Sequence, residues 1–544
     1  MNLKSYPTWL NEAIIYQIFP PSFCDSNGDG LGDLNGIRSK LDYIRSLGAN
    51  TLWLSPIFDS PFRDAGYDVR DYRKIAPRYG SMEDFEALIQ AVHARDMRLL
   101  LDFVPGHTSS EHPWFLQSCQ HERNQYSDRY IWTDRTFYEG SMFDEPDQFI
   151  IGHGDRIGNY MSNFFYFQPS LNYGYAEPKP ECPFQKDYRD PQLKPLREEM
   201  FDIMRFWLDK GVDGYRVDMA SSLIKGRDSA AVQRAMVEFW SEVREWWDVD
   251  YPDALLLAEW SNPTQAVECG FHLDFMIHFG EANGMKPFRG ENDRTILHRN
   301  GVSYFDRRGK GSLNSFWEEF ERHRDKIAVS GHLSIPTGNH DLPRYALGRD
   351  FRDLKIINTF LFTLPQVPTI YYGDEIGMRN LSDLPSKEGA YDRTGARTPM
   401  QWDGSVNAGF SSSAPEALYL PVDPKPERPT VASQDADENS LLHHVKTLIA
   451  LREAHPALGL EGTLRLINHG GGDYPLLYLR ELETEGFLIV LNPLESKRIV
   501  EFELSGEAGT FLYGQIDLQT QEDSTQRAVI EPLSACILEW KPRH

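Results

Sequence analysis

Eight short, strongly apolar runs recur between residues 13 and 375, and amphipathic stretches separate most of them. Such near-continuous runs are typical of strands buried on both faces of a parallel sheet, with helices as the crossover connections. Eight strand–helix units predict an α/β fold in which the sheet closes into a (β/α)8 TIM barrel. The runs cover residues 13–20, 51–56, 98–104, 214–219, 254–260, 275–279, 333–341 and 369–375.

The spacing of these runs predicts how the chain divides into domains. The third and fourth runs are too far apart for one crossover helix, and structureless loops longer than about 15 residues are uncommon. We therefore predict that the catalytic barrel comprises residues 1–106 and 191–462, and that residues 107–190 form an inserted subdomain. Beyond this, short alternating strands predict an antiparallel β-sandwich over residues 463–544.

Composition excludes several classes of partner. The net charge is −25 and there is no Lys/Arg-rich run, so neither nucleic acid nor a membrane surface is expected as a partner. Five scattered cysteines without CxxC spacing favour a reducing compartment. No stretch approaches the roughly 18 apolar residues that span a bilayer, and the start lacks a signal-peptide pattern. We expect a cytoplasmic protein, and the oligomeric state stays open.

Four acidic residues follow four of the apolar runs, where the chain leaves each predicted strand. They are Asp102, Asp218, Glu259 and Asp341. Active sites of such barrels lie at the C-terminal ends of the strands. One acid there could be a helix N-cap. Four acids converging on one mouth indicate a site, because buried carboxylates are costly unless they are paired or used.

Two chemistries use such a cluster, metal-assisted hydrolysis and glycoside cleavage. The first is disfavoured because HxH and HExxH are absent. The second needs an ionised carboxylate nucleophile and a carboxylic acid with a raised pKa. Arg216 lies two residues before Asp218, hence on the same side of its strand, and predicts a lowered pKa for that carboxyl group. The apolar run before Glu259 predicts a raised pKa for it.

The motifs at these strand ends occur in a family-specific order. The sequence resembles the α-amylase family of glycoside hydrolases (family thirteen), in particular its oligo-1,6-glucosidase, α-glucosidase and trehalose synthase branch. The resemblance covers almost the whole chain. Its motifs here are DFVPGH, GVDGYRVDM, LLAEW and GNHD, together with YDVRDY, QPSLN, YYGDEIGM and ARTPMQWD.

The resemblance implies a role for each acid of the site. Asp218 would be the nucleophile, Glu259 the general acid/base, and Asp341 a third carboxylate that grips sugar hydroxyl groups. Arg216 would orient the nucleophile, and Asp102 would be structural. A covalent glucosyl-enzyme would retain the anomeric configuration.

The resemblance also implies how one glucose unit, in subsite −1, would be held. His107 and His340 would bind this sugar, and Tyr67 would stack beneath it. Asp68 would pair with Arg344 and close the subsite at the non-reducing end. A closed end implies exo action on terminal glucose.

The sequence departs from the family pattern at three positions. Gly106 stands where the family commonly has Asn, and so lacks an amide that usually supports the site. Ser170, in QPSLN, stands where an acid is usual. Met219 follows the nucleophile, where Val tends to mark α-1,6 specificity and Ala or Thr α-1,4 specificity. The linkage preference is therefore not readable.

Three functions follow from these residues. The first is an exo-acting retaining α-glucosidase that cleaves terminal α-linked glucose from short oligosaccharides or small glucosides, without an organic cofactor. The second is a glucosyltransferase or trehalose synthase-type isomerase, because the chemistry is shared up to the glucosyl-enzyme. A non-catalytic sugar-binding relative is disfavoured, because all three acids are present and no anchor is visible.

The stretch DSNGDGLGD, residues 25–33, offers oxygen ligands at alternate positions among small residues. The twelfth position from its start is Gly36, where an EF-hand needs Glu, so a calcium sensor is rejected. An Asx-rich turn without an ion stays open. The resemblance implies a structural calcium ion, with ligands Asp25, Asn27, Asp29, Asp33 and the carbonyl group of Leu31.

Overall fold

The structure is a computed structural model. It describes residues 6–134, 148–152, 154–277, 302–467, 474–483, 485–521 and 524–541.

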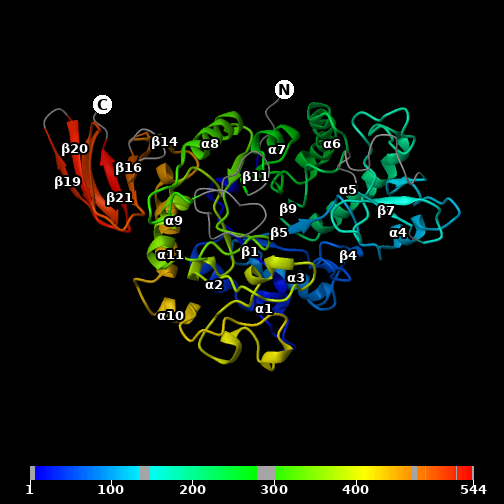
Figure 1. The fold of residues 1–544 in the computed structure, drawn as a ribbon, viewed down its shortest axis with the longest axis horizontal. Coiled ribbons are helices and arrows are strands. Elements are labelled where there is room, and N and C mark those ends of the chain that lie inside the picture. Colours follow the sequence, from blue (N-terminus) through cyan, green and yellow to red (C-terminus); the bar gives the residue numbers. More distant parts are fainter. Residues whose placement is uncertain are drawn as a thin grey trace.

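An eight-stranded parallel sheet forms the centre of the molecule, with strand order β12-β11-β10-β9-β5-β2-β1-β13 (Figure 1). The two outer strands are joined by hydrogen bonds from Val367 N to Leu333 O (3.0 Å) and from Thr337 N to Thr369 O (2.9 Å). The sheet therefore closes, and the predicted barrel is confirmed. Its strands are β1 (Ile15–Ile18), β2 (Thr51–Leu54), β5 (Arg98–Phe103), β9 (Gly214–Val217), β10 (Leu255–Ala258), β11 (Leu273–Phe275), β12 (His332–Ser334) and β13 (Thr369–Tyr371).

The sixth barrel strand differs from its prediction. The predicted run covers residues 275–279, whereas β11 ends at Phe275, so the two share only that residue. Residues 278 and 279 lie outside the described residues. Asp274 breaks the apolar pattern inside the strand and is fully buried. Its carboxyl group accepts the N–H groups of Trp260 (3.0 Å) and Asn262 (2.9 Å), which gives its buried oxygens hydrogen-bond partners. Asp274 thus interrupts the apolar pattern of the strand and also stabilises the turn after β10.

Amphipathic helices surround the barrel. In α3 the buried residues Phe85, Leu88, Ile89 and Val92 recur at helical spacing and face the sheet. Reciprocal capping boxes begin both α3 and α9. The helices around the barrel include α1 (Leu34–Ser39), α2 (Leu41–Leu47), α3 (Met82–His93), α5 (Lys194–Leu208), α6 (Ser229–Asp250), α7 (Pro263–Cys269), α8 (Asn314–Ile327), α9 (Phe351–Thr363) and α11 (Leu441–Ala454).

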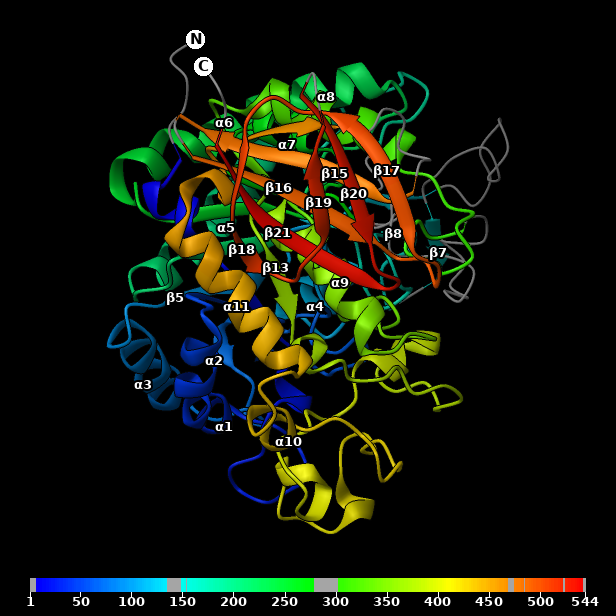
Figure 2. The same ribbon diagram turned by 90° about the vertical axis from the view of Figure 1, so that its left-hand side faces the viewer.

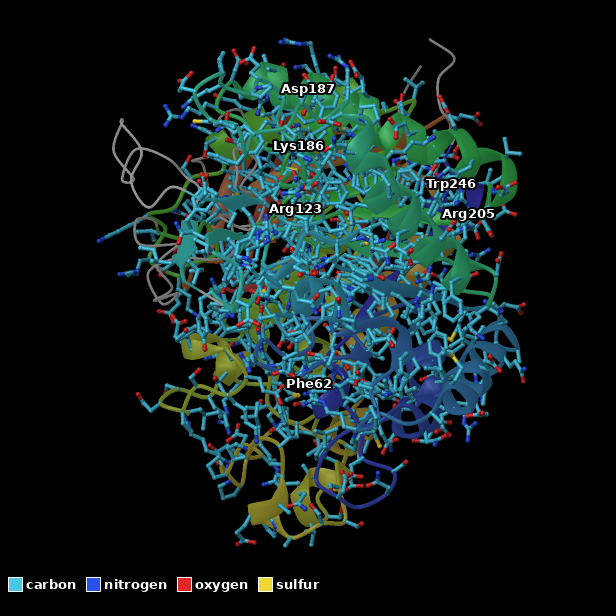
Figure 3. The ribbon with its side chains drawn as sticks, turned by 90° about the vertical axis from the view of Figure 1, so that its right-hand side faces the viewer. Phe62, Arg123, Lys186, Asp187, Arg205 and Trp246 are labelled. Carbon is cyan, nitrogen blue, oxygen red and sulfur yellow. The ribbon has the colours of Figure 1, made fainter. Side chains whose placement is uncertain are left out.

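Between β5 and β9 the chain forms a small subdomain at one side of the barrel (Figure 1). Its three-stranded sheet has the order β6 (Trp132–Thr133), β8 (Asn159–Ser162), β7 (Gln148–Ile151), and α4 (Pro113–Ser118) precedes it. Arg123 and Lys186 come together on its surface (Figure 3), because both pair with Asp128 at 2.6 and 3.3 Å. A backbone bridge between His107 and Ser170 ties the subdomain to the end of β5.

The C-terminal strands form two antiparallel sheets beside α9 and α11 (Figure 2). The sheets are β14 (Thr463–Leu466), β15 (Leu476–Leu482), β16 (Glu485–Asn492), β21 (Ser534–Lys541) and β18 (Glu507–Tyr513), and β17 (Arg498–Glu503), β20 (Thr525–Ile530) and β19 (Asp517–Thr520). Leu477 and Leu479 belong to the core between the sheets, whereas Leu476 and Tyr478 join the main core. Alternate residues of β15 thus serve two cores. Within the described ranges, no helix is long and apolar enough to cross a bilayer.

Candidate active site

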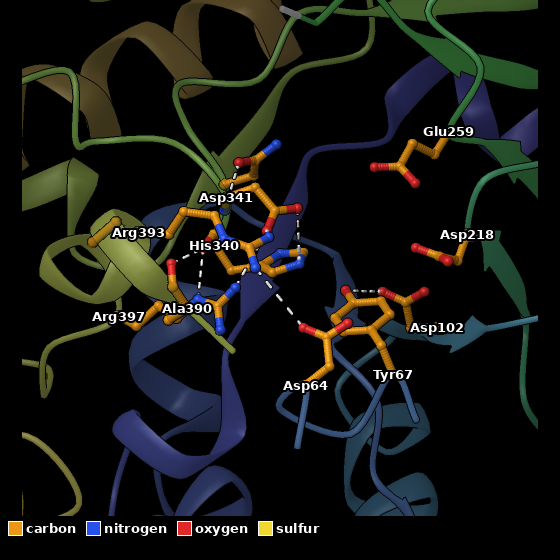
Figure 4. A network of polar contacts seen from close by, with 12 residues as sticks. Asp64, Tyr67, Asp102, Asp218, Glu259, His340, Asp341, Ala390, Arg393 and Arg397 are labelled. Carbon is orange, nitrogen blue, oxygen red and sulfur yellow. Dashed lines mark hydrogen bonds and ion pairs between the residues drawn. The ribbon is translucent and has the colours of Figure 1, made fainter. Parts of the chain in front are cut away.

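The guanidinium group of Arg216 joins three of the four acids predicted from the sequence. Its Nη1 lies 2.8 Å from Asp102 Oδ1 and 2.9 Å from Asp218 Oδ1, and its Nη2 lies 2.6 Å from Glu259 Oε1. None of the four residues is more than 7% exposed. They meet because β5, β9 and β10 are neighbours and the strand register sets Asp102 opposite Arg216. Figure 4 shows the three acids on one wall of the site.

The electrostatics of Asp218 differ from the prediction. Burial and the neighbouring Glu259 raise the pKa of Asp218 well above its usual value, although Arg216 acts in the opposite direction. One arginine shared among three carboxyl groups does not offset the burial of Asp218 and the repulsion that it meets. Asp218 therefore binds a proton more tightly in the free site than an exposed aspartate does.

The backbone after the nucleophile candidate adopts an unusual conformation. Met219 has φ of 43°, a region that non-glycine residues rarely occupy. This conformation aims its N–H group at Glu259 Oε2, 2.9 Å away. Asp274 holds the backbone of Trp260, immediately after Glu259. Both contacts fix the orientation of the Glu259 carboxyl group.

Asp341 lies on the opposite wall and faces Asp218 and Glu259 across the site (Figure 4). Its Oδ1 is 2.5 Å from Arg393 Nη1 and 3.2 Å from Arg397 Nη2. Burial would raise the pKa of Asp341, but His340 and the two arginines hold it well below its usual value. Asp341 is therefore a carboxylate across the whole range of pH in which the protein would be assayed.

His340 and Tyr67 form the floor between the two walls. The rings stack at 5.2 Å with an angle of 12° between their planes. Gln17 Nε2 donates to His340 Nδ1 at 2.9 Å, so the imidazole proton is on Nε2, which lies 3.2 Å from Asp341 Oδ2. Tyr67 donates its hydroxyl proton to Asp102 Oδ2 at 2.9 Å. Burial lowers the pKa of His340 to about 3, so the ring is neutral.

His107 lies beside Tyr67. Its Nε2 is 3.2 Å from the Tyr67 carbonyl oxygen, and Asn163 Nδ2 is 3.1 Å from its Nδ1. Burial lowers the pKa of His107 to about 3. The structure thus brings both predicted histidines to the site as neutral rings.

The predicted pair between Asp68 and Arg344 is wrong. Arg344 is buried, and its Nη1 is 2.7 Å from the Tyr372 carbonyl oxygen and 3.0 Å from Asp374 Oδ1. Asp68 is also buried, but its carboxylate accepts hydrogen bonds from its own loop, including the N–H groups of Arg63 and Asp64 at 3.0 Å. Each side chain makes its hydrogen bonds to nearer groups, and no contact joins the two.

Sequence reasoning missed the residues that take this place. Asp64 Oδ1 lies 3.8 Å from Arg393 Nη2, and Asp64 Oδ2 accepts from Gln168 Nε2 at 2.8 Å. Burial raises the pKa of Asp64 to about 6. Arg393 and Arg397 come from the segment around the 3-10 helix η6 (Tyr391–Ala396). The motif ARTPMQWD contains Arg397, which was the available signal.

Aromatic side chains are exposed next to this contact. The ring of Phe165 lies 5.7 Å from Tyr391 and 4.5 Å from Phe164, measured between centroids. A Cβ atom added at Gly389 would lie 3.3 Å from both Phe165 Cε2 and Asp64 Oδ1. Phe165 is therefore close to Asp64. Tyr391 is 60% exposed, and Tyr166 is 62% exposed. We call Phe164, Phe165, Tyr166 and Tyr391 the aromatic rim.

The aspartates of the predicted calcium loop accept hydrogen bonds from their own loop and from Ser411. Asp33 caps α1 and accepts from Gly36 N and Ser26, and Asp25 accepts three backbone N–H groups and the Ser411 hydroxyl group. Among the described residues, no group of three His, Cys, Asp or Glu side chains is placed to hold a metal ion. The predicted ligand set also includes Asn27 and the Leu31 carbonyl group, so the calcium ion stays a prediction, and no step of the chemistry is assigned to it.

Comparison with known proteins decides the family. The sequence profile of the alpha-amylase catalytic domain matches residues 17–460. The chain belongs to the α-amylase family. An oligo-1,6-glucosidase from Parageobacillus thermoglucosidasius is 32% identical to it over 538 residues, covering 89% of this chain and 90% of the relative. A trehalose synthase/amylase from Mycolicibacterium smegmatis is 30% identical, covering 93% of this chain and 88% of the relative.

Solved structures agree with this assignment. An isomaltulose synthase mutant from Erwinia rhapontici NX5, in complex with D-glucose, superposes with a TM-score of 0.79 at 27% identity. The match covers 98% of this chain and 100% of the other chain. This α-amylase family member is therefore a glycoside hydrolase by family, and its relatives include transglucosylating synthases.

Proposed function

We propose that the protein is an exo-acting retaining α-glucosidase that removes terminal α-linked glucose from short oligosaccharides or small glucosides. The observation that carries this proposal is the arrangement of Asp218 and Glu259 on one wall opposite the ionised Asp341. Two carboxyl groups on one wall of the site are what a retaining glycosidase needs, one as the nucleophile and one as the acid.

The reaction begins with substrate in the space between the walls. Asp218 attacks C1 of the glucosyl unit, the bond from C1 to the leaving oxygen breaks, and the carboxyl group of Glu259 gives its proton to that oxygen. The resulting ester joins C1 to Asp218. Glu259, now a carboxylate, takes a proton from water, whose oxygen attacks C1 and releases Asp218. Two inversions retain the α-configuration.

Asp341 and Arg393 bind the glucosyl unit on the opposite wall. Asp341 stays ionised and accepts hydrogen bonds from sugar hydroxyl groups. The contact between Asp64 and Arg393 closes the non-reducing end, in place of the predicted pair between Asp68 and Arg344. A closed end limits the enzyme to one terminal glucose, which is the basis of exo action.

The aromatic rim receives the leaving group. An aromatic face packs against the C–H groups of a sugar ring. The exposed Tyr391 offers such a face next to Phe165, which lies near Asp64. A few exposed rings suit a short leaving group rather than a polymer. The protein would act on a small α-glucoside in the cytoplasm, where its five buried cysteine thiols stay reduced.

The second candidate is glucosyl transfer or isomerisation to another disaccharide. Relatives that carry out such reactions are as similar to the chain as the glucosidases are, as the trehalose synthase and isomaltulose synthase matches indicate. In that case a sugar hydroxyl group held at the rim replaces water in the second step.

Product analysis tests both candidates. The enzyme is incubated with maltose, isomaltose, sucrose and trehalose, and products are followed by proton NMR from the first minutes. We expect α-glucose to appear before its β-anomer, in stoichiometric yield. Initial release of β-glucose would refute the retaining mechanism. Accumulation of an isomeric disaccharide in place of glucose would assign the enzyme to the second candidate.

A further inference from the structure

The absence of a side chain at Gly106 leaves room for an amide from the inserted subdomain. A Cβ atom at position 106 would lie 2.8 Å from Asn163 Nδ2 and 3.6 Å from Ser222 Oγ. Real Cβ atoms essentially never come within 3.0 Å of another heavy atom. The Asn163 amide group therefore occupies the space that a side chain at position 106 would need.

Lys225 determines which way this amide group faces. Its Nζ lies 2.9 Å from Asn163 Oδ1 and 2.6 Å from the Ser222 carbonyl oxygen. An ammonium group can only donate, so the oxygen of the amide faces Lys225 and its NH2 group faces the active site. There, Asn163 Nδ2 lies 3.1 Å from His107 Nδ1 and 3.7 Å from Met219 Sδ.

This orientation sets the tautomer of His107. Nδ1 accepts a hydrogen bond from the Asn163 NH2 group, so the imidazole proton resides on Nε2, which donates to the Tyr67 carbonyl oxygen at 3.2 Å. The ring is neutral, so its tautomer is fixed by these two partners. The same amide group contacts the sulfur atom of Met219. Met219 follows Asp218 in the chain, and its backbone N–H group donates to Glu259.

We propose that Asn163 is a positioning residue of the active site, supplied by the inserted subdomain in place of a side chain at position 106. Its amide group holds His107 in one tautomer and packs against Met219 on the leaving-group side of Asp218. The inference rests on the proposed function, in which His107 and Asp218 meet the glucosyl unit. The rate of turnover then depends on how the inserted subdomain is positioned against the barrel.

An isosteric variant tests the donor. Asn163→Asp keeps the shape and the contact with Lys225 but cannot donate to His107 Nδ1. We expect kcat/KM for the best substrate of the product screen to fall about 10- to 100-fold, as for other residues that orient site groups. The melting temperature should change little.

The pH dependence separates a positioning role from a structural one. In Asn163→Asp the neutral His107 would place its proton on Nδ1 and turn a lone pair toward the Tyr67 carbonyl oxygen. Protonation restores the Nε2 donor, and the new carboxylate raises the pKa of His107. The ratio of variant to wild-type kcat/KM should therefore rise as pH falls from 8 to 5. A ratio independent of pH would overturn the proposal.

A swap of the amide group provides the second test. Asn163→Ala removes the donor, and Gly106→Asn alone places a side chain against Asn163. The double variant supplies an amide from position 106 into the vacated space. We expect it to regain about tenfold or more in kcat/KM over Asn163→Ala, within the range that orienting residues contribute. A double variant as poor as the product of the two single effects would overturn the proposal.

Asn124→Ala is the matched control, because Asn124 lies in the same subdomain but donates to the Gln117 carbonyl oxygen and not to His107. It should leave kcat/KM unchanged. A wild-type enzyme inactive on every α-glucoside would refute the proposed function rather than the role of Asn163. The dissociation constant of 1-deoxynojirimycin, an iminosugar that mimics glucose, then tests Asn163→Ala by calorimetry. Weaker binding supports the role, and equal binding overturns it.

Discussion

Arg393 Nη1 lies 2.5 Å from Oδ1 of Asp341, a residue 52 positions earlier in the chain. The guanidinium group is held in place by the carbonyl oxygens of Gly389 (2.7 Å) and Ala390 (3.1 Å). It is therefore fixed before a substrate arrives. The contact keeps Asp341 ionised and sets its orientation toward Asp218 and Glu259.

Removal of this guanidinium group should impair sugar binding. We expect Arg393→Ala to lower kcat/KM by about 30-fold or more, because loss of one partner of a buried ion pair costs about 2–5 kcal/mol. Arg393→Lys keeps the charge and should give an intermediate value. Steady-state kinetics on the best disaccharide measure the effect. An alanine variant as active as the wild type would exclude Arg393 from the site.

The acid and the nucleophile should respond differently to the leaving group. Glu259→Gln should lose several orders of magnitude in kcat on a disaccharide, because the leaving oxygen then receives no proton. It should lose far less on α-glucosyl fluoride, whose leaving group needs no protonation. Asp218→Asn should be inactive on both substrates. Equal losses for the two variants on the fluoride would contradict these roles.

Glu375 makes the stability of the fold depend on pH. Burial raises its pKa to about 7 from 4.5, although hydroxyl groups of Tyr16 and Tyr43 donate to it. The folded state holds this proton more tightly than the unfolded state, so the stabilisation is complete below about pH 4.5 and is lost as pH rises toward 7. The glutamine in Glu375→Gln cannot ionise, so the variant should lose less stability as pH rises.

Denaturant midpoints at pH 5 and pH 8 measure the effect. The wild type should lose more stability over this interval than Glu375→Gln does. Glu416→Gln is the control at an exposed position and should behave as the wild type. A Glu375→Gln variant with the wild-type slope would show that Glu375 does not titrate in this window.

Asp25 stabilises its loop with or without an ion. Its Oδ1 accepts the N–H groups of Asn27 (3.0 Å) and Gly28 (2.7 Å), and its Oδ2 accepts that of Gly30 (2.8 Å) and the Ser411 hydroxyl group (2.5 Å). Asp25→Ala should lower the free energy of unfolding by about 1–3 kcal/mol, since these donors lose their acceptor.

The predicted calcium ion is tested in the same melting experiment. EDTA should lower the melting temperature of the wild type but not of Asp25→Ala if the loop holds calcium. Identical wild-type curves with EDTA and with added calcium would refute that prediction. The loss of stability in Asp25→Ala should persist in either case.

The aromatic rim should matter only when a leaving group is present to contact it. We expect Tyr391→Ala to raise KM for a disaccharide several-fold, because a ring contact contributes about 0.5–1.5 kcal/mol. The same variant should hydrolyse α-glucosyl fluoride as the wild type does. Ile499→Ala removes an exposed apolar side chain from the C-terminal sandwich and serves as the control. Equal effects on both substrates would contradict the placement of the leaving group.

The barrel and its acids were predictable because the signals are local. Apolar runs mark strands buried on both faces, and the acid after each run must lie at the same end of a parallel barrel. Asp102, Asp218 and Glu259 meet at Arg216 for this reason. The sixth strand was misplaced because Asp274 interrupts the apolar pattern that marks such strands.

The pairing of charges was decided only by the tertiary structure. Arg344 and Asp68 each find a nearer partner, while Arg393 reaches Asp341 and Asp64 from a segment after the last barrel strand. A motif names the residues near a site, but the partner of a buried charge depends on distances of a few ångströms that spacing does not encode.

The tertiary structure also decided the pKa of Asp218 and which side chain fills the space beside Gly106. The sequence placed Arg216 beside Asp218 and suggested a lowered pKa, yet three carboxyl groups share that arginine and burial dominates. The sequence by itself determined the fold, the family and the acids, since these follow from local patterns. Only the folded chain brings Asn163 into the space beside Gly106, because that space is formed by segments that approach one another in three dimensions.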